Sequence, residues 1–308
     1  MGEGMEFERL MLLSDSLRVE VLPGLGGKIS SLWLLDADEE LLQKPLKPYA
    51  PRTRTMGFEE GDASGIDECI PTVSGCELDG IVFPDHGDFW RVPFRHRYDG
   101  EALVLDADGF TLPLHFEKRL SLQGSRLKMA YVLRNSGTAP VQYLWSAHPG
   151  FAVEAGDRVV LPESVAEVTV WWSAGSRLGA PGRAHSWPQT RDEYGSHVDL
   201  SVTGGATDGV GDKLFSPAPP EGWVAIWRKR LRRRIEVHFD PMQNPYVGLW
   251  LAYGGWPGGD GLRQHCVALE PCTAPADSLT AAAERGWART LAPGASRQWK
   301  MELRVVSE

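Results

Sequence analysis

The chain has 308 residues, 42% of them hydrophobic and 24% charged, which allows a large core and is close to globular averages. Its formal net charge of −9 argues against a nucleic-acid or anionic-membrane partner. No apolar run approaches the roughly 18 residues of a membrane span. The first six residues are acidic and lack the basic and apolar regions of a secretory signal. We therefore expect a cytoplasmic protein with reduced thiols.

Short alternating segments at the start of the chain predict β-strands. Residues 17–21 and 29–34 are expected to form a hairpin around a glycine-rich turn at 23–27. The glycines of that turn resemble a phosphate-binding loop. A strand pattern rather than a helix start follows them, so dinucleotide binding is not expected. Residues 43–65, rich in proline and glycine, are expected to form a long loop, and loops of such length are often functional.

Residues 83–90 form a better ligand-site candidate than anything in the first sixty residues. They combine an imidazole, two carboxylates and three aromatic side chains in eight positions, including Asp85 and His86. Loops of that composition often bind ligands. The alternative is a surface turn with solvated charge.

From residue 102 onward the strand pattern is nearly continuous. Regular short strands with turn residues between them indicate antiparallel sheets rather than a βαβ arrangement. The one helix expected spans 277–285, with Asp277 or Ser278 as its N-cap. No internal repeat or linker divides the sequence, so we expect a single domain over residues 1–308.

Residues 228–234 contain six basic side chains in seven positions, between two predicted strands. In an acidic protein such a cluster is expected at a solvated hairpin tip. Binding of a phosphate group on a substrate is the alternative use, and it stays open.

Two apolar strands are each expected to end in one ionisable residue followed by a proline. These are Glu270-Pro271 and His148-Pro149. Proline supplies no backbone donor and fixes the chain direction, so each side chain should be held in one orientation. A carboxylate and an imidazole form a general acid–base pair if the fold brings them together.

A metal site built from His86, His148 and Glu270 is arithmetically possible, because catalytic zinc usually takes three protein ligands. Nothing in their local spacing requires a metal, so none is expected. The four cysteines have no zinc-type spacing either.

The order and spacing of several short segments along the chain resemble those of the aldose 1-epimerase, or galactose mutarotase-like, family. The resemblance covers nearly the whole chain, from residue 17 to the final strand. It rests on Asp85-His86-Gly87, Trp145-Ser146-Ala147-His148-Pro149-Gly150-Phe151, Gly211-Asp212-Lys213-Leu214-Phe215, Leu249-Trp250 and Leu269-Glu270-Pro271-Cys272-Thr273. It implies an all-β fold, a β-supersandwich of large antiparallel sheets with few short helices. The site would occupy a cleft on the concave face of one sheet.

The resemblance also implies roles for individual residues. Glu270 would be the general base that removes the proton from the C1 hydroxyl of a pyranose. His148 would be the general acid that protonates the ring oxygen. His86 would hydrogen-bond the sugar near that oxygen, and Asp212 would anchor sugar hydroxyls.

Asp85 and Trp250 lie in matching segments and are expected to contact the substrate. Where the family usually has an arginine before the first histidine, residues 56–60 here are acidic, and Arg52 or Arg54 is the candidate replacement. The second histidine motif is His-Pro-Gly-Phe, where the commoner form has an aromatic residue in third place. These departures indicate a divergent branch whose sugar need not be galactose or glucose.

The expected function is a mutarotase that interconverts the α- and β-anomers of an aldose without any cofactor. Ring opening of a hemiacetal needs one proton removed from O1 and one given to O5, which such a pair can do near neutral pH. The alternatives are a hexose-6-phosphate mutarotase that uses residues 228–234, or a non-catalytic carbohydrate-binding protein. A polysaccharide lyase or hydrolase has less support, because no second well-placed catalytic acid is evident.

Overall fold

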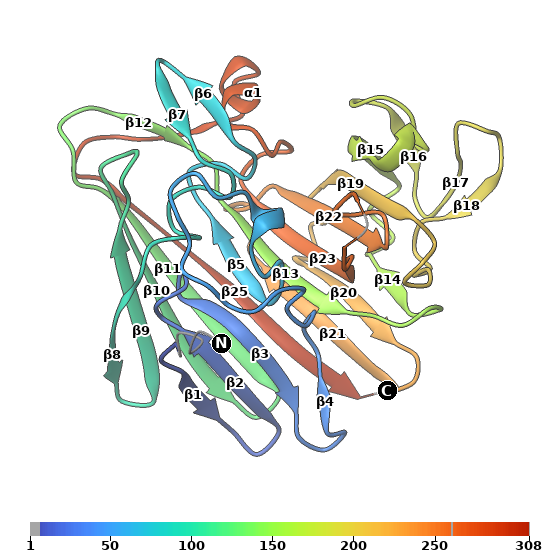
Figure 1. Ribbon diagram of the computed structural model, residues 1–308, viewed down its shortest axis with the longest axis horizontal. Coiled ribbons are helices and arrows are strands. Elements are labelled where there is room, and N and C mark those ends of the chain that lie inside the picture. Colours follow the sequence, from blue (N-terminus) through green and yellow to red (C-terminus); the bar gives the residue numbers. More distant parts are fainter. Residues whose placement is uncertain (1–6, 260, 308) are drawn as a thin grey trace.

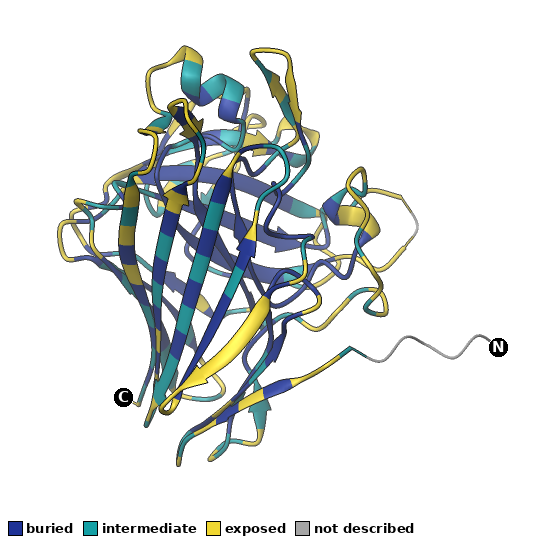
Figure 2. Ribbon diagram, turned by 90° about the vertical axis from the view of Figure 1, so that its left-hand side faces the viewer, coloured by how far each residue is buried: buried dark blue, intermediate teal, exposed yellow. Residues whose placement is uncertain are grey.

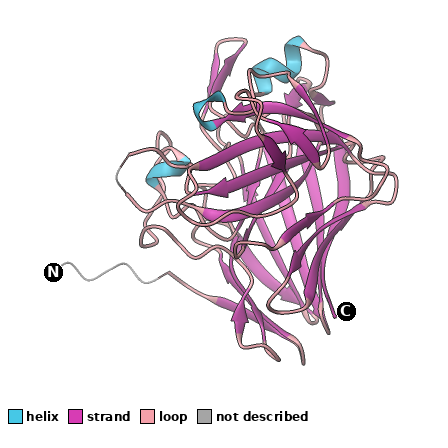
Figure 3. Ribbon diagram, turned by 90° about the vertical axis from the view of Figure 1, so that its right-hand side faces the viewer, coloured by secondary structure: helices cyan, strands magenta, loops and turns pink. Residues whose placement is uncertain are grey.

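The computed structural model describes residues 7–259 and 261–307, and antiparallel strands make up most of it (Figure 1). The acidic segment 1–6 lies outside the described residues. Two large sheets form the body of the molecule, and the short helices lie in connecting segments (Figure 3). The predicted all-β fold with large antiparallel sheets and few short helices is confirmed.

The larger sheet has 11 strands and supports the site described below. In spatial order its strands are β1 (Leu10–Leu13), β2 (Leu17–Leu22), β3 (Lys28–Leu34), β5 (Ile66–Cys69), β13 (Ser146–Ala152), β23 (His265–Cys272), β22 (Tyr246–Tyr253), β19 (Val210–Pro217), β15 (Glu167–Ser173) and β16 (Ala184–Ser186), with β4 (Glu39–Glu40) paired to β3. The predicted hairpin around residues 23–27 is formed by β2 and β3.

The second sheet has eight strands and covers one face of the first. In spatial order these are β14 (Arg158–Val160), β20 (Trp223–Arg228), β21 (Arg233–Phe239), β25 (Ser296–Ser307), β11 (Arg126–Asn135), β10 (Leu114–Gln123), β9 (Ala102–Asp108) and β8 (Arg95–Asp99). Figure 2 shows buried and less buried bands alternating along its inner strands, while the edge strand β8 is exposed throughout. This period of two is what a half-buried antiparallel sheet requires.

The remaining elements are small. Three two-stranded sheets are formed by β6 (Cys76–Leu78) with β7 (Ile81–Phe83), β12 (Val141–Tyr143) with β24 (Arg289–Leu291), and β17 (Gln189–Arg191) with β18 (His197–Asp199). Two 3₁₀ turns, η1 (Phe58–Glu60) and η2 (Ala174–Ser176), accompany the helix α1 (Leu279–Glu284). In the described ranges, no helix is long and apolar enough to cross a membrane.

Helix α1 is shorter than the predicted span of 277–285. Its N-cap is Ser278, whose hydroxyl accepts a hydrogen bond from the Ala281 amide at 3.3 Å. This is the ordinary capping arrangement, in which a side-chain oxygen satisfies a free amide of the first turn. Asp277, the other candidate cap, is therefore left available for a different role.

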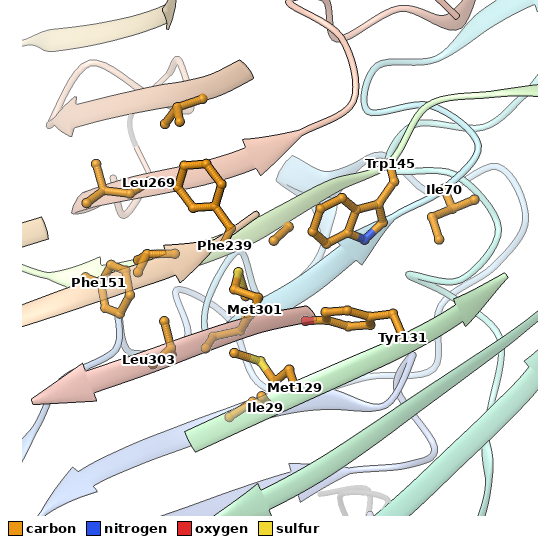
Figure 4. Close-up of a cluster of buried hydrophobic side chains, with 14 of the residues drawn as sticks. Ile29, Ile70, Met129, Tyr131, Trp145, Phe151, Phe239, Leu269, Met301 and Leu303 are labelled. Carbon is orange, nitrogen blue, oxygen red and sulfur yellow. The ribbon is translucent and has the colours of Figure 1, made fainter. Parts of the chain in front are cut away.

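The apolar core fills the space between the two large sheets. Figure 4 shows Phe151 and Leu269 of the larger sheet meeting Met129, Met301 and Leu303 of the smaller one. Each such side chain contributes about 1.5–3 kcal/mol when buried. Because strand neighbours point to opposite faces, burying Leu269 and Phe151 in the core directs Glu270 and His148 to the other face.

The strands that carry His148 and Glu270 continue past their prolines, so the predicted strand ends there are wrong. β13 contains Pro149 and β23 contains Pro271. The pairing between β13 and β23 is interrupted instead, and its register places His148 opposite Glu270. The pairs that flank the interruption are Ser146–Cys272 and Gly150–Ala268. Prolines lack the N–H that a ladder needs, so an opening between two strands accommodates them without ending either one.

Candidate active site

A cavity of about 450 Å³ lies over the face of the larger sheet that is turned away from the core. Strands β13, β19 and β22 form its floor, and loops form its rim. The residues that line it are Gly57, Phe58, Glu59, Val73, Ser74, Asp85, His86, His148, Trp171, Trp172, Lys213, Trp250, Trp256, Gln264 and Asp277. His148, Lys213 and Trp250 share one face because neighbouring residues of a strand point to opposite faces.

The structure brings His148 and Glu270 together. Nδ1 of His148 lies 2.9 Å from Oε1 of Glu270. An anion at that distance favours a proton on Nδ1. Nε2 is then the ring nitrogen that can hydrogen-bond a ligand in the cavity. His148 lines the cavity, whereas the Glu270 side chain is wholly buried behind it.

Oε1 of Glu270 lies beside His148 but has no hydrogen-bond partner among the described residues, whereas Oε2 is held by two donors. Oε2 accepts a hydrogen bond from Lys213 Nζ, and the Ser146 hydroxyl donates to the same oxygen at 3.3 Å. Burial raises the pKa of Glu270, but the charges of Lys213 and then of His148 outweigh burial and lower this pKa to about 2. Glu270 is therefore negatively charged at neutral pH.

Lys213 and Asp277 belong to the site although neither was a candidate from sequence. Lys213 Nζ lies between Glu270 and Asp277, 3.3 Å from Oδ1 of the latter. The opposite charges raise the pKa of Lys213 above its ordinary value despite its burial. Burial, with Glu270 nearby, raises the pKa of Asp277, and Lys213 opposes that rise. The cavity floor thus holds one cation between two carboxylates of different basicity.

Asp212, predicted to anchor sugar hydroxyls, lies outside the cavity. Its carboxylate accepts hydrogen bonds from the Ser173 hydroxyl at 2.6 Å and from Arg177 Nε at 3.0 Å. Both contacts fix the turn after β15. Asp212 and Lys213 are neighbours in β19, so one faces away from the cavity and the other lines it.

His86 lies beside His148, with the two rings edge to face and their centroids 5.4 Å apart. Phe58 stacks on the His86 ring at 3.9 Å and lies 5.3 Å from the His148 ring, centroid to centroid. His86 Nδ1 lies 3.1 Å from Oδ1 of Asp85, and Nε2 is buried with no hydrogen-bond partner among the described residues. A buried polar atom without a partner is costly, so a ligand group that pairs with Nε2 would be favoured.

Asp85 lines the cavity but uses both oxygens within the protein. Oδ2 accepts a hydrogen bond from the Phe58 amide at 2.7 Å, and Oδ1 is the partner of His86. Burial raises the pKa of Asp85, but the His86 charge and these hydrogen bonds lower it to about 2. His86 itself has a φ of +60°. Positive φ is uncommon for a side-chain-bearing residue and is often found at functional sites.

Aromatic rings form one wall of the cavity. Trp250, predicted to contact the substrate, lies 5.7 Å from Trp172 and 6.0 Å from Trp256, centroid to centroid. Trp250 Nε1 donates to Oε1 of Gln264 at 2.8 Å, and the same glutamine donates to the Ala63 carbonyl at 2.9 Å. These bonds fix the ring plane, and flat apolar surfaces of this kind stack on sugar rings.

Neither arginine expected to replace the family's substrate-binding arginine lines the cavity. Arg54 is exposed, with its guanidinium 4.3 Å from the Phe110 ring centre. Arg52 is buried, 2.6 Å from Asp62. Among the described lining residues, Lys213 is the sole lysine or arginine, and it is already paired.

The basic cluster at 228–234 also lies outside the cavity, at the turn between β20 and β21. Three of its arginines pair with acidic residues of neighbouring segments. The contacts are Arg228–Asp157 at 2.8 Å, Arg230–Glu39 at 2.6 Å and Arg233–Asp36 at 2.8 Å.

No three histidine, cysteine, aspartate or glutamate side chains in the described part of the chain are arranged to hold a metal ion. His86 and His148 each direct Nδ1 at a carboxylate instead. Each imidazole therefore has a carboxylate oxygen as the neighbour of its Nδ1 atom.

No family model and no curated protein matches the chain. Solved structures match it over nearly its whole length. The Slr1438 protein of Synechocystis sp. PCC 6803 is 17% identical with a TM-score of 0.70, covering 98% of this chain and 97% of that one. A galactose mutarotase related enzyme of Lactobacillus acidophilus is 16% identical with a TM-score of 0.66, covering 97% and 98%.

A galactose mutarotase-like protein of Clostridium acetobutylicum is 13% identical with a TM-score of 0.65, covering 98% of this chain and 96% of that one. The chain therefore has the galactose mutarotase-like fold that the sequence resemblance predicted. Its low identity to these proteins is that of a divergent branch. Likeness at this level establishes the fold, and the activity has to be argued from the site.

Proposed function

We propose that the protein is an aldose 1-epimerase, or mutarotase, that interconverts the α- and β-anomers of a sugar without a cofactor. The observation that carries the proposal is the His148–Glu270 pair, with Nδ1 and Oε1 2.9 Å apart at the floor of a cavity walled by tryptophan rings. A protein that only binds sugar has no need of a buried acid–base pair behind its binding surface.

In this mechanism a protonated His148 gives its Nε2 proton to the ring oxygen O5 while the C1–O5 bond breaks. A base removes the proton from the O1 hydroxyl, and the sugar opens to an aldehyde. Rotation about C1–C2 presents the other face of the carbonyl, and the same transfers in reverse close the ring. His86, through its unpaired Nε2, would hydrogen-bond the sugar beside O5.

The sequence assigned the base role to Glu270, and direct transfer remains a prediction. As arranged, Glu270 has no exposed surface, and Lys213 occupies Oε2. Its charge therefore acts through His148, where it stabilises the imidazolium that forms or is consumed in each step.

The cavity favours a neutral sugar over a phosphorylated one. Glu59, Asp85 and Asp277 are acidic, whereas its one lysine is paired with two carboxylates. Phosphate binding usually relies on unpaired arginines, lysines or backbone amides, and carboxylates repel it. The hexose-6-phosphate alternative would need residues 228–234, which lie at another part of the fold.

Anomeric exchange measured by NMR saturation transfer tests the proposal, with a panel of free and 6-phosphorylated aldoses and with Glu270→Gln beside the wild type. We expect wild-type exchange above the buffer rate on a neutral aldose. In the variant we expect a loss of about a hundredfold or more, the usual scale for losing acid–base catalysis. Sugar binding without acceleration of any anomer would point to a carbohydrate-binding protein instead.

A further inference from the structure

A second cavity, of about 360 Å³, lies beside the cavity that holds His148. Its volume is in the range of small-molecule sites. Four aromatic side chains and one arginine are among its lining residues: Trp171, Phe215, Tyr246, Trp287 and Arg285. None of the described residues that line it is acidic, whereas the first cavity has several carboxylates.

Three segments of the chain contribute to both cavities. Trp171 of β15 lines the two of them. β19 places Lys213 in the first cavity and Phe215 in the second, with Lys213 Nζ 5.3 Å from the centre of the Phe215 ring. The segment before α1 gives Asp277 to the first and Pro275 to the second. A ligand longer than one sugar ring that enters the first cavity would therefore reach the second.

An irregularity in β15 places Trp171 at this boundary. In the pairing of β15 with β19, Val170 is opposite Leu214 and Trp172 is opposite Lys213, so Trp171 is an extra residue without a partner. Such a bulge re-aims a side chain, and bulges are common beside active sites. In a regular strand Trp171 and Trp172 would point to opposite faces, whereas here both line the first cavity.

The second cavity presents the two kinds of surface that a sugar binds. The guanidinium carbon of Arg285 lies 5.2 Å from the ring centre of Trp287 and 6.0 Å from that of Trp171. No carboxylate of the described residues forms an ion pair with Arg285, so its N–H groups are available to hydroxyl oxygens. Trp287 is 36% exposed, so its ring has apolar surface that the C–H face of a sugar would cover.

We propose that the second cavity binds a further sugar unit, and that the substrate is a neutral disaccharide or longer oligosaccharide whose reducing end enters the first cavity. The inference rests on the mutarotase function proposed above and names its substrate class. The reducing unit opens and closes at His148 as before. The unit linked to it packs against Trp171 and Trp287, and Arg285 donates hydrogen bonds to its hydroxyls. The linkage between the units stays intact, so no further chemical step is needed.

The test measures anomeric exchange on glucose, galactose and mannose, and on disaccharides linked through O3, O4 or O6 that carry each of these at the reducing end. We expect kcat/KM on at least one disaccharide to exceed that on its monosaccharide by about tenfold, the effect of one good contact. The gain should lie mainly in KM, because the added contacts hold substrate and transition state alike.

Trp287→Ala and Arg285→Ala should each lower this preference, the ratio of the two kcat/KM values, by about threefold to tenfold. Trp33→Ala is the matched control. Trp33 lies in β3, outside both cavities, and its ring has the guanidinium of Arg18 at the same 5.2 Å. The control should keep the wild-type preference.

Equal or slower exchange on every disaccharide would overturn this inference while the mutarotase function stands. A wild-type preference in both Trp287→Ala and Arg285→Ala would overturn it too, because the second cavity would not be the source. Faster exchange on glucose 6-phosphate than on any disaccharide, lost in Arg285→Ala, would assign the cavity to a phosphate group instead. No exchange by the wild type on any sugar would remove the proposed function and this inference together.

Calorimetric titration separates binding from turnover. In Glu270→Gln, the preferred disaccharide should bind about tenfold more tightly than its monosaccharide, and adding Trp287→Ala should reduce that difference. Equal affinities for the two sugars in Glu270→Gln would contradict the inference.

Discussion

Two wholly buried glutamates on the larger sheet show opposite behaviour. Glu68 of β5 faces the core, where it accepts a hydrogen bond from Trp145 Nε1 at 2.9 Å and lies 3.8 Å from Lys118 Nζ. Glu270 of β23 faces the cavity side, in direct contact with Lys213 and 2.9 Å from His148. Burial raises the pKa of Glu68, whereas Lys213, followed by His148, lowers the pKa of Glu270 to about 2 despite its burial.

The difference shows that burial alone does not decide whether a carboxylate is charged. Lys118 donates its hydrogen bond to the Gly27 carbonyl, so Glu68 receives its charge only from a distance. Lys213 instead donates directly to Glu270. Coulomb energy falls with the separation of two charges, whereas the desolvation cost of a buried carboxylate does not. The direct contact with Lys213 therefore outweighs the burial of Glu270, while burial outweighs the more distant Lys118 at Glu68. The core carboxyl is thereby structural, and the cavity carboxylate keeps a charge that chemistry can use.

The largest effect should follow from removing the cation on the cavity side. Lys213→Met leaves Glu270 and Asp277 without their shared partner, and breaking a buried pair in this way costs about 3–5 kcal/mol of unfolding free energy. Urea unfolding at neutral pH measures it. The matched change Lys118→Met should cost less, because Glu68 is already inclined to be neutral. Equal losses in the two variants would contradict the comparison.

An intermediate effect should appear as opposite pH dependence. The pKa of Glu270 lies below its ordinary value of 4.5, so its contribution of about 3 kcal/mol is present above pH 4.5 and lost as pH falls toward 2. The pKa of Glu68 is raised, so its contribution is present below 4.5 and lost as pH rises above it. Unfolding free energies from about pH 3 to 8 should therefore lose acid sensitivity in Glu270→Gln. In Glu68→Gln the unfolding free energy should fall less than in the wild type as pH rises. Parallel curves for all three proteins would refute this account.

How far the site could be predicted depended on which face each residue occupies. Glu270 and His148 were found because each stands in an apolar strand beside a proline, and the register then places them opposite each other. Asp212 was preferred to Lys213, yet a one-residue step along a strand changes the face, and β19 directs the lysine to the cavity. The bulge in β15, between Val170 and Trp172, shifts the register beside β19, and no sequence pattern marks it.

Asp277 was missed for a different reason. Its position just before a helix made it a candidate cap, and Ser278, the next residue, performs that role instead. The all-β architecture needed only alternation and turn residues, which are local signals. The cavity joins loops and strands that are far apart in sequence. Phe58, for example, contacts both Trp256 and the floor residue His148, and local sequence patterns cannot predict such long-range contacts.

The smallest effect on the unfolding free energy should come from an ion pair that is exposed to solvent. Arg230 pairs with Glu39 and Glu154 at the β20–β21 turn, and its side chain is 52% exposed. Surface ion pairs contribute about 0–1 kcal/mol, so Arg230→Ala should cost less than that. Exchange on free and 6-phosphorylated sugars should match the wild type. A selective loss on phosphorylated sugars would restore a phosphate-binding role for the basic cluster.

Strand β25 lies inside the smaller sheet, between β21 and β11, yet it is the last described strand to leave the ribosome. Until it emerges, β14, β20 and β21 are separated from β8 to β11, and the nascent chain holds two half-sheets with open edges. Open edges are templates for wrong pairing. Correct folding therefore requires that the 12 residues of β25 join both half-sheets before their open edges pair with other strands.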